Sequence, residues 1–319
     1  MPRVFFITGT STGFGHYYTQ EVLDRGDYVV ATARNISQLQ FKGATDENWL
    51  ATRLEVTDQQ SVQKAFDDAL SKFGRIDVVV NNAGYGLVGC FEEYTDTQIR
   101  QQMEVNFFGV LDVTRTAMQY MRDNQAPPGG CIQQVTSMAG QLGFPTYSIY
   151  CASKWAVEGF TEAVSHEVKP EWGIKFTLIE PGGFSWGDGY VSNSQVAGGS
   201  RGLNCVNAVV SDMLLDLVIP YIRTDWTGRS VTIADRSSNY EHLDSADRTN
   251  KRHGTQRGDP VKAAKAMYEL AVMPNPPLRV ILGSDAHKLI TAKVERDGQN
   301  CKKFSEFSNS TDVDGDVPP

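Results

Sequence analysis

Thr8-Gly-Thr-Ser-Thr-Gly-Phe-Gly15 follows a short β-rich run, Val4-Phe-Phe-Ile7, near the start of the chain. Its three glycines allow a sharp backbone turn, and the turn leads into a stretch that predicts a helix over about residues 17–25. A strand, a glycine-rich turn and a helix in this order are typical of a site that binds a pyrophosphate at the helix N-terminus. The alternative is a tight turn that binds no ligand, since the spacing is G-x-x-x-G-x-G.

Strand and helix patterns alternate along the rest of the chain. The block Ile76-Asp-Val-Val-Val-Asn-Asn82 is apolar on both faces, as expected of a buried parallel strand. Repeated β-α units predict a Rossmann-type, doubly wound α/β fold with a ligand crevice at the carboxyl ends of its strands. The other predicted strands span residues 27–33, 52–56, 131–136, 175–179 and 279–283, and the other predicted helices span 58–73, 97–122, a segment from Tyr150 onward, and 261–271.

The composition, 40% hydrophobic and 21% charged residues, predicts a single globular domain over residues 1–304, followed by a disordered tail over 305–319. A net charge of -8 argues against a nucleic-acid partner, which would need clustered Lys and Arg. No run approaches the roughly 18 apolar residues of a membrane span. The five cysteines and five histidines form no ligand pattern, so we expect reduced thiols, a cytoplasmic protein and no metal.

Tyr150-Cys-Ala-Ser-Lys154 carries the second chemical signal. Residues four apart share a helix face, so the phenol and the ammonium would lie one turn apart. The ammonium should then lower the pKa of Tyr150 from its ordinary value of about 10 and allow proton transfer near neutral pH. Ser137 would hold a substrate oxygen. An exposed Tyr–Lys pair on a helix surface is the alternative for so short a motif.

Taken together, these motifs resemble those of the short-chain dehydrogenase/reductase family over about residues 4–184, and again from Arg223. Further matches are Asn81-Asn-Ala-Gly84 at the end of a strand, Asn106, and Pro181-Gly182. The cofactor-binding positions that we expect are Gly9, Ser11, Gly13, Gly15, Arg34, Glu55, Val56, Asn82, Ala83, Gly84, Tyr150, Lys154, Pro181, Gly182 and Thr224.

The resemblance implies an oxidoreductase with four catalytic residues. Tyr150 would be the general acid in carbonyl reduction or the general base in alcohol oxidation, and Lys154 would bind the nicotinamide ribose. Ser137 would orient the reacting oxygen, and Asn106 would support a proton relay through water. The chain end resembles a branch that acts on lipophilic alcohols, aldehydes and ketones, of the retinol and 17-beta-hydroxysteroid dehydrogenase type. The resemblance leaves open whether the chain forms a homodimer or a homotetramer.

The end of the second strand predicts the cofactor. An acidic residue there would accept hydrogen bonds from the ribose of NAD, but this chain has Ala31-Thr-Ala-Arg-Asn35. Arg34 could pair with a 2′-phosphate, and Ser11 could add a hydroxyl, so we predict NADP(H). The alternative is that Arg34 is a solvated surface residue.

Residues 185–222 separate two parts of the chain that adjoin in many relatives. Three interpretations are open: these residues form a lid over the substrate pocket, they are an insertion packed on the surface, or they are encoded by an intron that was translated in error. Residues 185–258 as a whole are expected to form the insertion and the substrate-lid region. Thr224 must return beside Pro181 if it is to hold the nicotinamide carboxamide. A dinucleotide-binding protein with little or no catalytic activity is therefore the second functional hypothesis.

Overall fold

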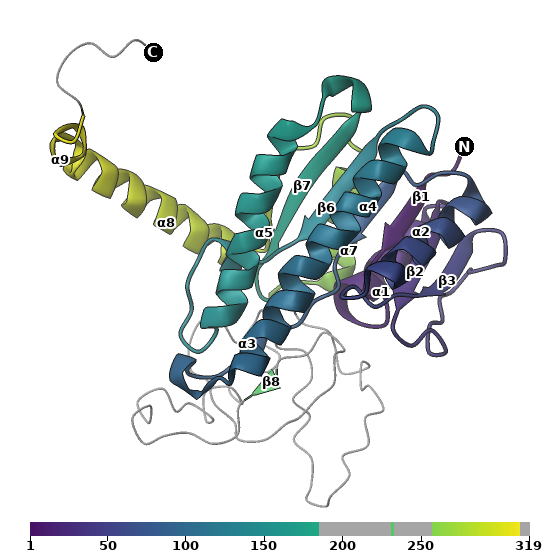
Figure 1. Cartoon of the computed structure of the whole chain (residues 1–319), viewed down its shortest axis with the longest axis horizontal. Coiled ribbons are helices and arrows are strands. Elements are labelled where there is room, and N and C mark those ends of the chain that lie inside the picture. Colours follow the sequence, from purple (N-terminus) through teal and green to yellow (C-terminus); the bar gives the residue numbers. More distant parts are fainter. Residues whose placement is uncertain (185–230, 233–256, 313–319) are drawn as a thin grey trace, which may run out of the picture.

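A computed structural model describes residues 1–184, 231–232 and 257–312 of the chain. In this part, seven parallel strands form one sheet in the order β3-β2-β1-β4-β6-β7-β9 (Figure 1). The predicted doubly wound Rossmann fold is confirmed. The chain adds β2 and β3 on one side of β1 and then crosses to the other side, where it adds β4, β6, β7 and β9. The strands are β1 (Val4–Ile7), β2 (Tyr28–Ala33), β3 (Trp49–Arg53), β4 (Val78–Asn81), β6 (Gly130–Val135), β7 (Ile174–Pro181) and β9 (Arg279–Leu282), and β5 (Leu87–Val88) pairs separately with β8 (Val231–Thr232).

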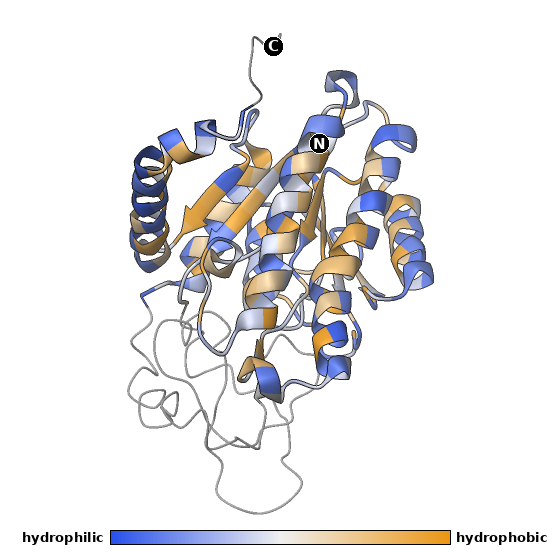
Figure 2. Cartoon of the chain, turned by 60° about the vertical axis from the view of Figure 1, so that its left-hand side comes forward, coloured by the Kyte–Doolittle hydropathy of each residue, from blue (hydrophilic) through white to orange (hydrophobic). Residues whose placement is uncertain are grey.

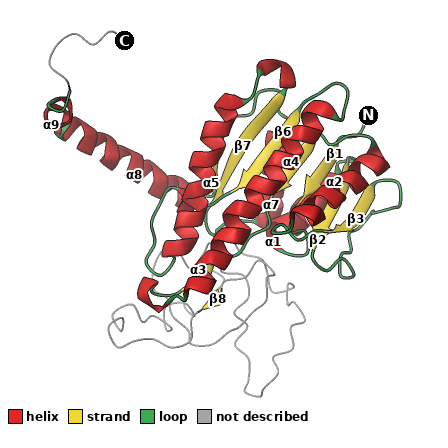
Figure 3. Ribbon diagram, viewed as in Figure 1, coloured by secondary structure: helices red, strands yellow, loops and turns green. Residues whose placement is uncertain are grey.

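Helices cover both faces of the sheet (Figures 1 and 3). One face carries α2 (Gln59–Phe73), α4 (Gly109–Asp123) and α5 (Ser148–Glu167), and the other carries α1 (Gly13–Asp24) and α7 (Pro260–Val272). The remaining described α-helices are α3 (Asp96–Met103), α8 (Ser284–Lys303) and α9 (Ser305–Asn309).

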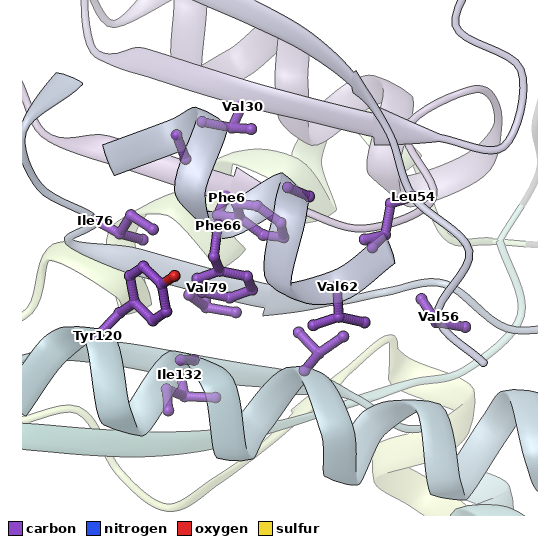
Figure 4. Close-up of a cluster of buried hydrophobic side chains, with 14 of the residues drawn as sticks. Phe6, Val30, Leu54, Val56, Val62, Phe66, Ile76, Val79, Tyr120 and Ile132 are labelled. Atoms are coloured by element: carbon purple, nitrogen blue, oxygen red, sulfur yellow. The ribbon is translucent and has the colours of Figure 1, made fainter. Parts of the chain in front are cut away.

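The core consists of strand side chains packed between these helix layers. Phe6 of β1 stacks on Phe66 of α2 with ring centroids 4.2 Å apart, and Tyr120 of α4 packs beside them (Figure 4). The strands consist mainly of apolar residues (Figure 2). Such a composition is expected where helices on both faces of a sheet shield its side chains from water. Burial of this kind stabilises the fold by roughly 25 cal/mol for each Å² of apolar surface removed from water.

Three boundaries differ from the predictions. The helix α1 begins at Gly13, directly after the glycine turn, rather than at residue 17. The third strand was predicted at residues 52–56, but β3 ends at Arg53, and the buried residues Leu54 and Val56 pack against the core from a loop. The long helix predicted over residues 97–122 is interrupted by a π-helical turn, Glu104–Phe108.

The end of the chain was predicted wrongly in part. The helix α8 was not predicted, because its sequence is mostly polar and only Ala286 and Ile290 of its residues are buried. Residues 305–309 form α9, although the sequence predicted disorder there, since local backbone bonds such as Ser308 N–H to Phe304 O continue the helical path. Residues 313–319 and most of 185–258 lie outside the described part.

None of the described helices is both long and apolar enough to cross a membrane. Within the described ranges, no three His, Cys, Asp or Glu side chains are placed together so that they could hold a metal ion.

Candidate active site

The glycine turn lies between β1 and α1 and has little room for side chains. Gly9 and Gly13 adopt left-handed conformations, with φ of 70° and 59°, which favour glycine. A Cβ atom on Gly15 would lie 2.3 Å from the Gly9 carbonyl oxygen and 2.6 Å from Nδ2 of Asn82. The turn is therefore a close-packed backbone structure that a larger residue at position 15 would disrupt.

The segment after β4 fixes this turn by hydrogen bonds. Asn82 donates from Nδ2 to the carbonyl oxygens of Thr8 and Gly9, at 2.8 and 3.1 Å. The Thr8 hydroxyl accepts from the backbone N–H groups of Asn82 and Ala83, both at 2.9 Å. The sequence did not predict this role of Thr8, because it depends on a partner far along the chain.

The geometry fits the pyrophosphate of a dinucleotide. The first turn of α1 carries no acidic side chain that would repel a phosphate, and the helix N-terminus favours negative charge. Gly9, Ser11, Gly13 and Gly15 all belong to this turn or to the start of the helix.

The other expected cofactor positions follow the ends of neighbouring strands. Arg34 comes directly after β2 and is half-buried, and the Thr10 N–H donates to Thr32 O at 2.9 Å, which ties the glycine turn to this strand end. Val56 is buried against Gly109, whereas the Glu55 carboxylate accepts a hydrogen bond from the Thr57 hydroxyl at 3.0 Å. Because the strands are parallel, all these segments lie at one edge of the sheet.

Ser137, Tyr150 and Lys154 come together at the same edge. Ser137 follows β6, and its hydroxyl, which accepts from Ala139 N–H at 3.1 Å, neighbours the side chain of Tyr150 of α5. Lys154 lies one turn further along α5, with Nζ 5.8 Å from the centroid of the Tyr150 ring. Its ammonium donates to the carbonyl oxygen of Val135 at 2.9 Å. Tyr150 is 2% exposed and Lys154 is 7% exposed, so neither forms a surface pair.

Burial changes the proton affinity of both side chains. Loss of hydration raises the pKa of Tyr150 above its ordinary value, and the neighbouring Ser137 side chain opposes the rise only in part. The same effect lowers the pKa of Lys154 to about 8, against the opposing charge of Glu158. The expected lowering of the Tyr150 pKa is therefore wrong for this structure, because desolvation of the buried phenolate is the dominant effect.

Asn106 reaches this group through the π-helical turn. Its Nδ2 donates to Tyr85 O at 2.8 Å and to the Ser153 hydroxyl at 3.2 Å, and its Oδ1 accepts from Tyr85 N–H. A Cβ on Gly84 would lie 3.1 Å from Asn106 Oδ1 and 3.8 Å from Lys154 Nζ. Asn106 and Lys154 thus meet at Gly84, the last residue of the Asn-Asn-Ala-Gly segment.

Pro181 ends β7, and Gly182 follows it beside the first turn of α8. Asp285 accepts a hydrogen bond from Gly183 N–H at 2.7 Å, and a Cβ on Gly182 would lie 2.3 Å from its Oδ1 atom. Asp285 was not predicted, because the sequence indicated no helix there. Phe184, three residues after Pro181, is buried and packs edge-on against Phe14. Thr224 lies outside the described residues.

Comparison with known proteins identifies relatives of this chain among the oxidoreductases. The profile of the short chain dehydrogenase family matches residues 3–189. An uncharacterized oxidoreductase of Schizosaccharomyces pombe, C162.03, is 33% identical over 97% of this chain and 91% of its own length. A 3-ketodihydrosphingosine reductase of Bacteroides thetaiotaomicron is 38% identical over 58% of this chain and 65% of its own.

Solved structures share the fold. A short-chain dehydrogenase from Streptomyces avermitilis matches with a TM-score of 0.77 and 28% identity, over 98% of this chain and all of that one. Two Burkholderia structures match at lower identity. One, from B. cenocepacia in complex with NADP, has a TM-score of 0.63, 18% identity and coverage of 95% and 97%. The other, from B. phymatum in complex with NAD, has a TM-score of 0.66, 21% identity and coverage of 100% and 98%. The chain therefore belongs to the short chain dehydrogenase family of oxidoreductases.

Proposed function

We propose that this protein interconverts a hydrophobic alcohol and its ketone or aldehyde, with Tyr150 as the general acid or base. The observation that carries the proposal is that the buried side chains of Tyr150 and Ser137 are neighbours, with Lys154 one helical turn from Tyr150 and buried as well. A carbonyl oxygen beside these two hydroxyls would accept a hydrogen bond from Ser137 and a proton from Tyr150.

The proton chemistry favours carbonyl reduction. A bound nicotinamide cofactor would supply the hydride, which goes to the carbonyl carbon, while the chain provides the proton for the oxygen. Because burial raises the pKa of Tyr150, the phenol is protonated at neutral pH and serves as an acid. Lys154 would hold the ribose, and Asn106 would connect the ammonium to a water chain that restores the proton.

For the cofactor we propose NADP(H). The bond from Thr10 N–H to Thr32 O supports this choice, because it places the segment of Ser11 beside the segment of Arg34. A 2′-phosphate between them would meet a guanidinium and a hydroxyl, both of which are suited to phosphate oxygens. The second strand ends without a carboxylate that would favour the 2′-hydroxyl of NAD.

An apolar substrate fits the surroundings of Tyr150. Half-buried Phe144 packs against a cluster that contains Met138, Tyr147 and Tyr150. The name of the Bacteroides relative supports a ketone as the reacting group, since that enzyme is a ketone reductase.

The test is oxidation of NADPH and of NADH by the full chain, with a panel of apolar aldehydes and ketones. We expect turnover with NADPH, and we expect Arg34→Ala to weaken NADPH binding about ten- to hundredfold while NADH binding changes little. Arg53→Ala is the matched control, because Arg53 is exposed at the end of the adjacent strand β3. Turnover with NADH alone would refute the choice of NADP. Tight cofactor binding without any turnover would favour a catalytically silent protein.

A further inference from the structure

Two buried carboxylates lie directly behind the catalytic pair. Glu158 is on α5, one turn beyond Lys154, and is 5% exposed. Glu180 is the penultimate residue of β7, just before Pro181, and is fully buried. Buried carboxylates are costly unless they are hydrogen-bonded or paired, so their partners indicate what they do.

Glu158 links three strands of the sheet. The Thr136 hydroxyl, next to Ser137, lies 2.5 Å from its Oε1 atom, and Arg279 of β9 donates from Nε to its Oε2 at 3.1 Å. Glu180 of β7 lies beside Glu158 and interacts with it, and both of its carboxylate oxygens accept from Nε2 of Gln141 at 2.7 Å. The Glu158 side chain also packs against Gly140, where a Cβ would lie 2.9 Å from its Cγ atom.

Glu158 and Glu180 share one cation, Arg279, so the negative charge of the pair is compensated if only one of the two carboxylates is ionised. Burial and the neighbouring Glu158 charge raise the pKa of Glu180 to about 7, so Glu180 carries the shared proton near neutrality. Burial raises the pKa of Glu158 too, but its contacts with Thr136 and Arg279 oppose the rise, so we assign the negative charge of the pair to Glu158. Glu162, one turn further along α5, is exposed and pairs with the other side of the Arg279 guanidinium at 2.6 Å.

Lys154 is the group that this anion affects. Its ammonium is buried and contacts a neutral carbonyl oxygen, and burial lowers the pKa of Lys154 to about 8. Glu158 is the charge that opposes this effect. Tyr150, the other titratable side chain facing Lys154, is neutral below its raised pKa and supplies no compensating charge.

We propose that Glu158 is a positioning residue, which keeps Lys154 protonated and ties the end of β6, with Ser137, to helix α5. The proposal rests on the proposed function, because Lys154 must be an ammonium to bind the ribose and support Tyr150. Glu158 touches neither hydroxyl of the reacting pair. It acts through Lys154 and through Thr136.

The hydrogen bonds of the Thr136 hydroxyl are also compatible with a protonated, uncharged Glu158. This hydroxyl also lies 3.0 Å from Ile179 O, so a protonated Glu158 could donate to Thr136 while Thr136 donated to Ile179. Glu158 would then carry no charge, and its replacement by an amide would leave Lys154 unaffected.

The direct test is the titration of Lys154 in the full chain, followed by NMR of ¹³C-labelled lysine side chains and assigned with Lys154→Met. We expect Glu158→Gln to shift the Lys154 titration to lower pH, because the amide keeps the shape but removes the charge. Glu162→Gln, which removes an exposed partner of the same Arg279, should leave it unchanged. An unshifted titration in Glu158→Gln would overturn the proposal.

The second measurement is the pH dependence of turnover with NADPH and an apolar ketone from the panel. In Glu158→Gln the loss of activity at high pH should begin at lower pH than in the wild type, and Glu162→Gln should follow the wild type. A shifted Lys154 titration with an unchanged pH profile would remove Glu158 from catalysis. If the wild type turns over nothing, the proposed function fails, and the NMR comparison still decides whether Glu158 controls Lys154.

Thr136→Val provides the same test if Glu158→Gln does not fold. The substitution removes the hydroxyl that orients the Glu158 carboxylate. Loss of this hydrogen bond to the anion favours the protonated form of Glu158. We expect a smaller shift of the Lys154 titration in the same direction, and no shift would overturn the proposal.

Discussion

The two halves of the candidate site are built from different interactions. The cofactor half, residues 8–15 with 82–84, is held by backbone shape and by neutral hydrogen bonds such as those of Thr8 and Asn82. The catalytic half, Ser137 and Tyr150 with Lys154, Glu158 and Glu180, is held in part by buried ionisable groups. One half therefore depends on close packing, and the other depends on which groups carry protons.

This difference determines how each half responds to change. Neutral backbone bonds keep their strength over a wide pH range, so the cofactor half should be insensitive to pH. The protonation states of the catalytic half depend on burial and on neighbours from β6, β7 and β9, so it should respond to pH and to single charges. The same difference predicts that substitutions in the first half act on cofactor binding and those in the second act on turnover.

The largest effect is expected for Tyr150→Phe. The variant keeps the ring in its apolar cluster but cannot donate the proton, so turnover should fall by about 10²- to 10⁴-fold. NADPH binding, measured by fluorescence titration, should stay close to that of the wild type. Tyr147→Phe, in the same cluster, is the control and should retain turnover within about tenfold. Comparable turnover in both variants would remove Tyr150 from its assigned role.

Gly15→Ala should cause the largest loss in the cofactor half. The new methyl group would meet the Gly9 carbonyl oxygen and the Asn82 amide, so the turn must open, at a cost of about 1–3 kcal/mol or more. NADPH affinity should fall at least about tenfold, with little change in its pH dependence. Gly159→Ala is the matched control, since no atom lies within 4 Å of a Cβ at that position in α5. Normal NADPH affinity in Gly15→Ala would show that the turn does not shape the cofactor site.

The sequence allowed the cofactor half to be predicted better than the catalytic half. Glycine spacing after a strand reflects local backbone geometry, so Gly9, Gly13 and Gly15 could be placed on the turn from the sequence. Among the catalytic candidates, Tyr150, Lys154 and Ser137 were suggested by the short motif and Asn106 by the family resemblance, and the structure brings all four together. Whether they carry those roles stays a prediction.

Protonation in the catalytic half could not be predicted. The sequence predicted that Lys154 would lower the pKa of Tyr150, because the two are four residues apart. The opposite direction follows from burial, which depends on the whole fold. Glu158 and Glu180 were missed for the same reason, since their partner Arg279 comes from β9, far along the chain.

Thr8→Val should destabilise the fold by an intermediate amount. It removes the hydroxyl that accepts from the part-buried Asn82 N–H and Ala83 N–H groups, and leaving a donor unsatisfied costs up to about 1–3 kcal/mol when it is buried. Urea unfolding should show this loss at pH 6 and at pH 8 alike, because no titratable group is involved. Thr8→Ser keeps the hydroxyl and should recover most of the stability. A loss that varied with pH would contradict the neutral character of the cofactor half.

The smallest effect, and the one that separates the two halves most clearly, is expected for Glu180→Gln. The pKa of Glu180 rises from an ordinary 4.5 to about 7, so the folded chain binds this proton more tightly than the unfolded chain. The resulting stabilisation is complete below pH 4.5 and is lost as the pH rises to about 7.

The amide of Glu180→Gln remains neutral and can still bond to Glu158 and Gln141. The stability of the variant relative to wild type should therefore increase between pH 4.5 and 7, measured by urea unfolding. The pKa of Lys154 is lowered to about 8, so its contribution to stability rises with pH, whereas that of Glu180 falls. Lys154 is present in both proteins and therefore does not contribute to the difference between them. Glu162→Gln, at an exposed position, should show no such trend. A stability difference that is flat with pH in Glu180→Gln would mean that Glu180 is ionised in the fold, and the catalytic half would then carry one more negative charge behind Lys154.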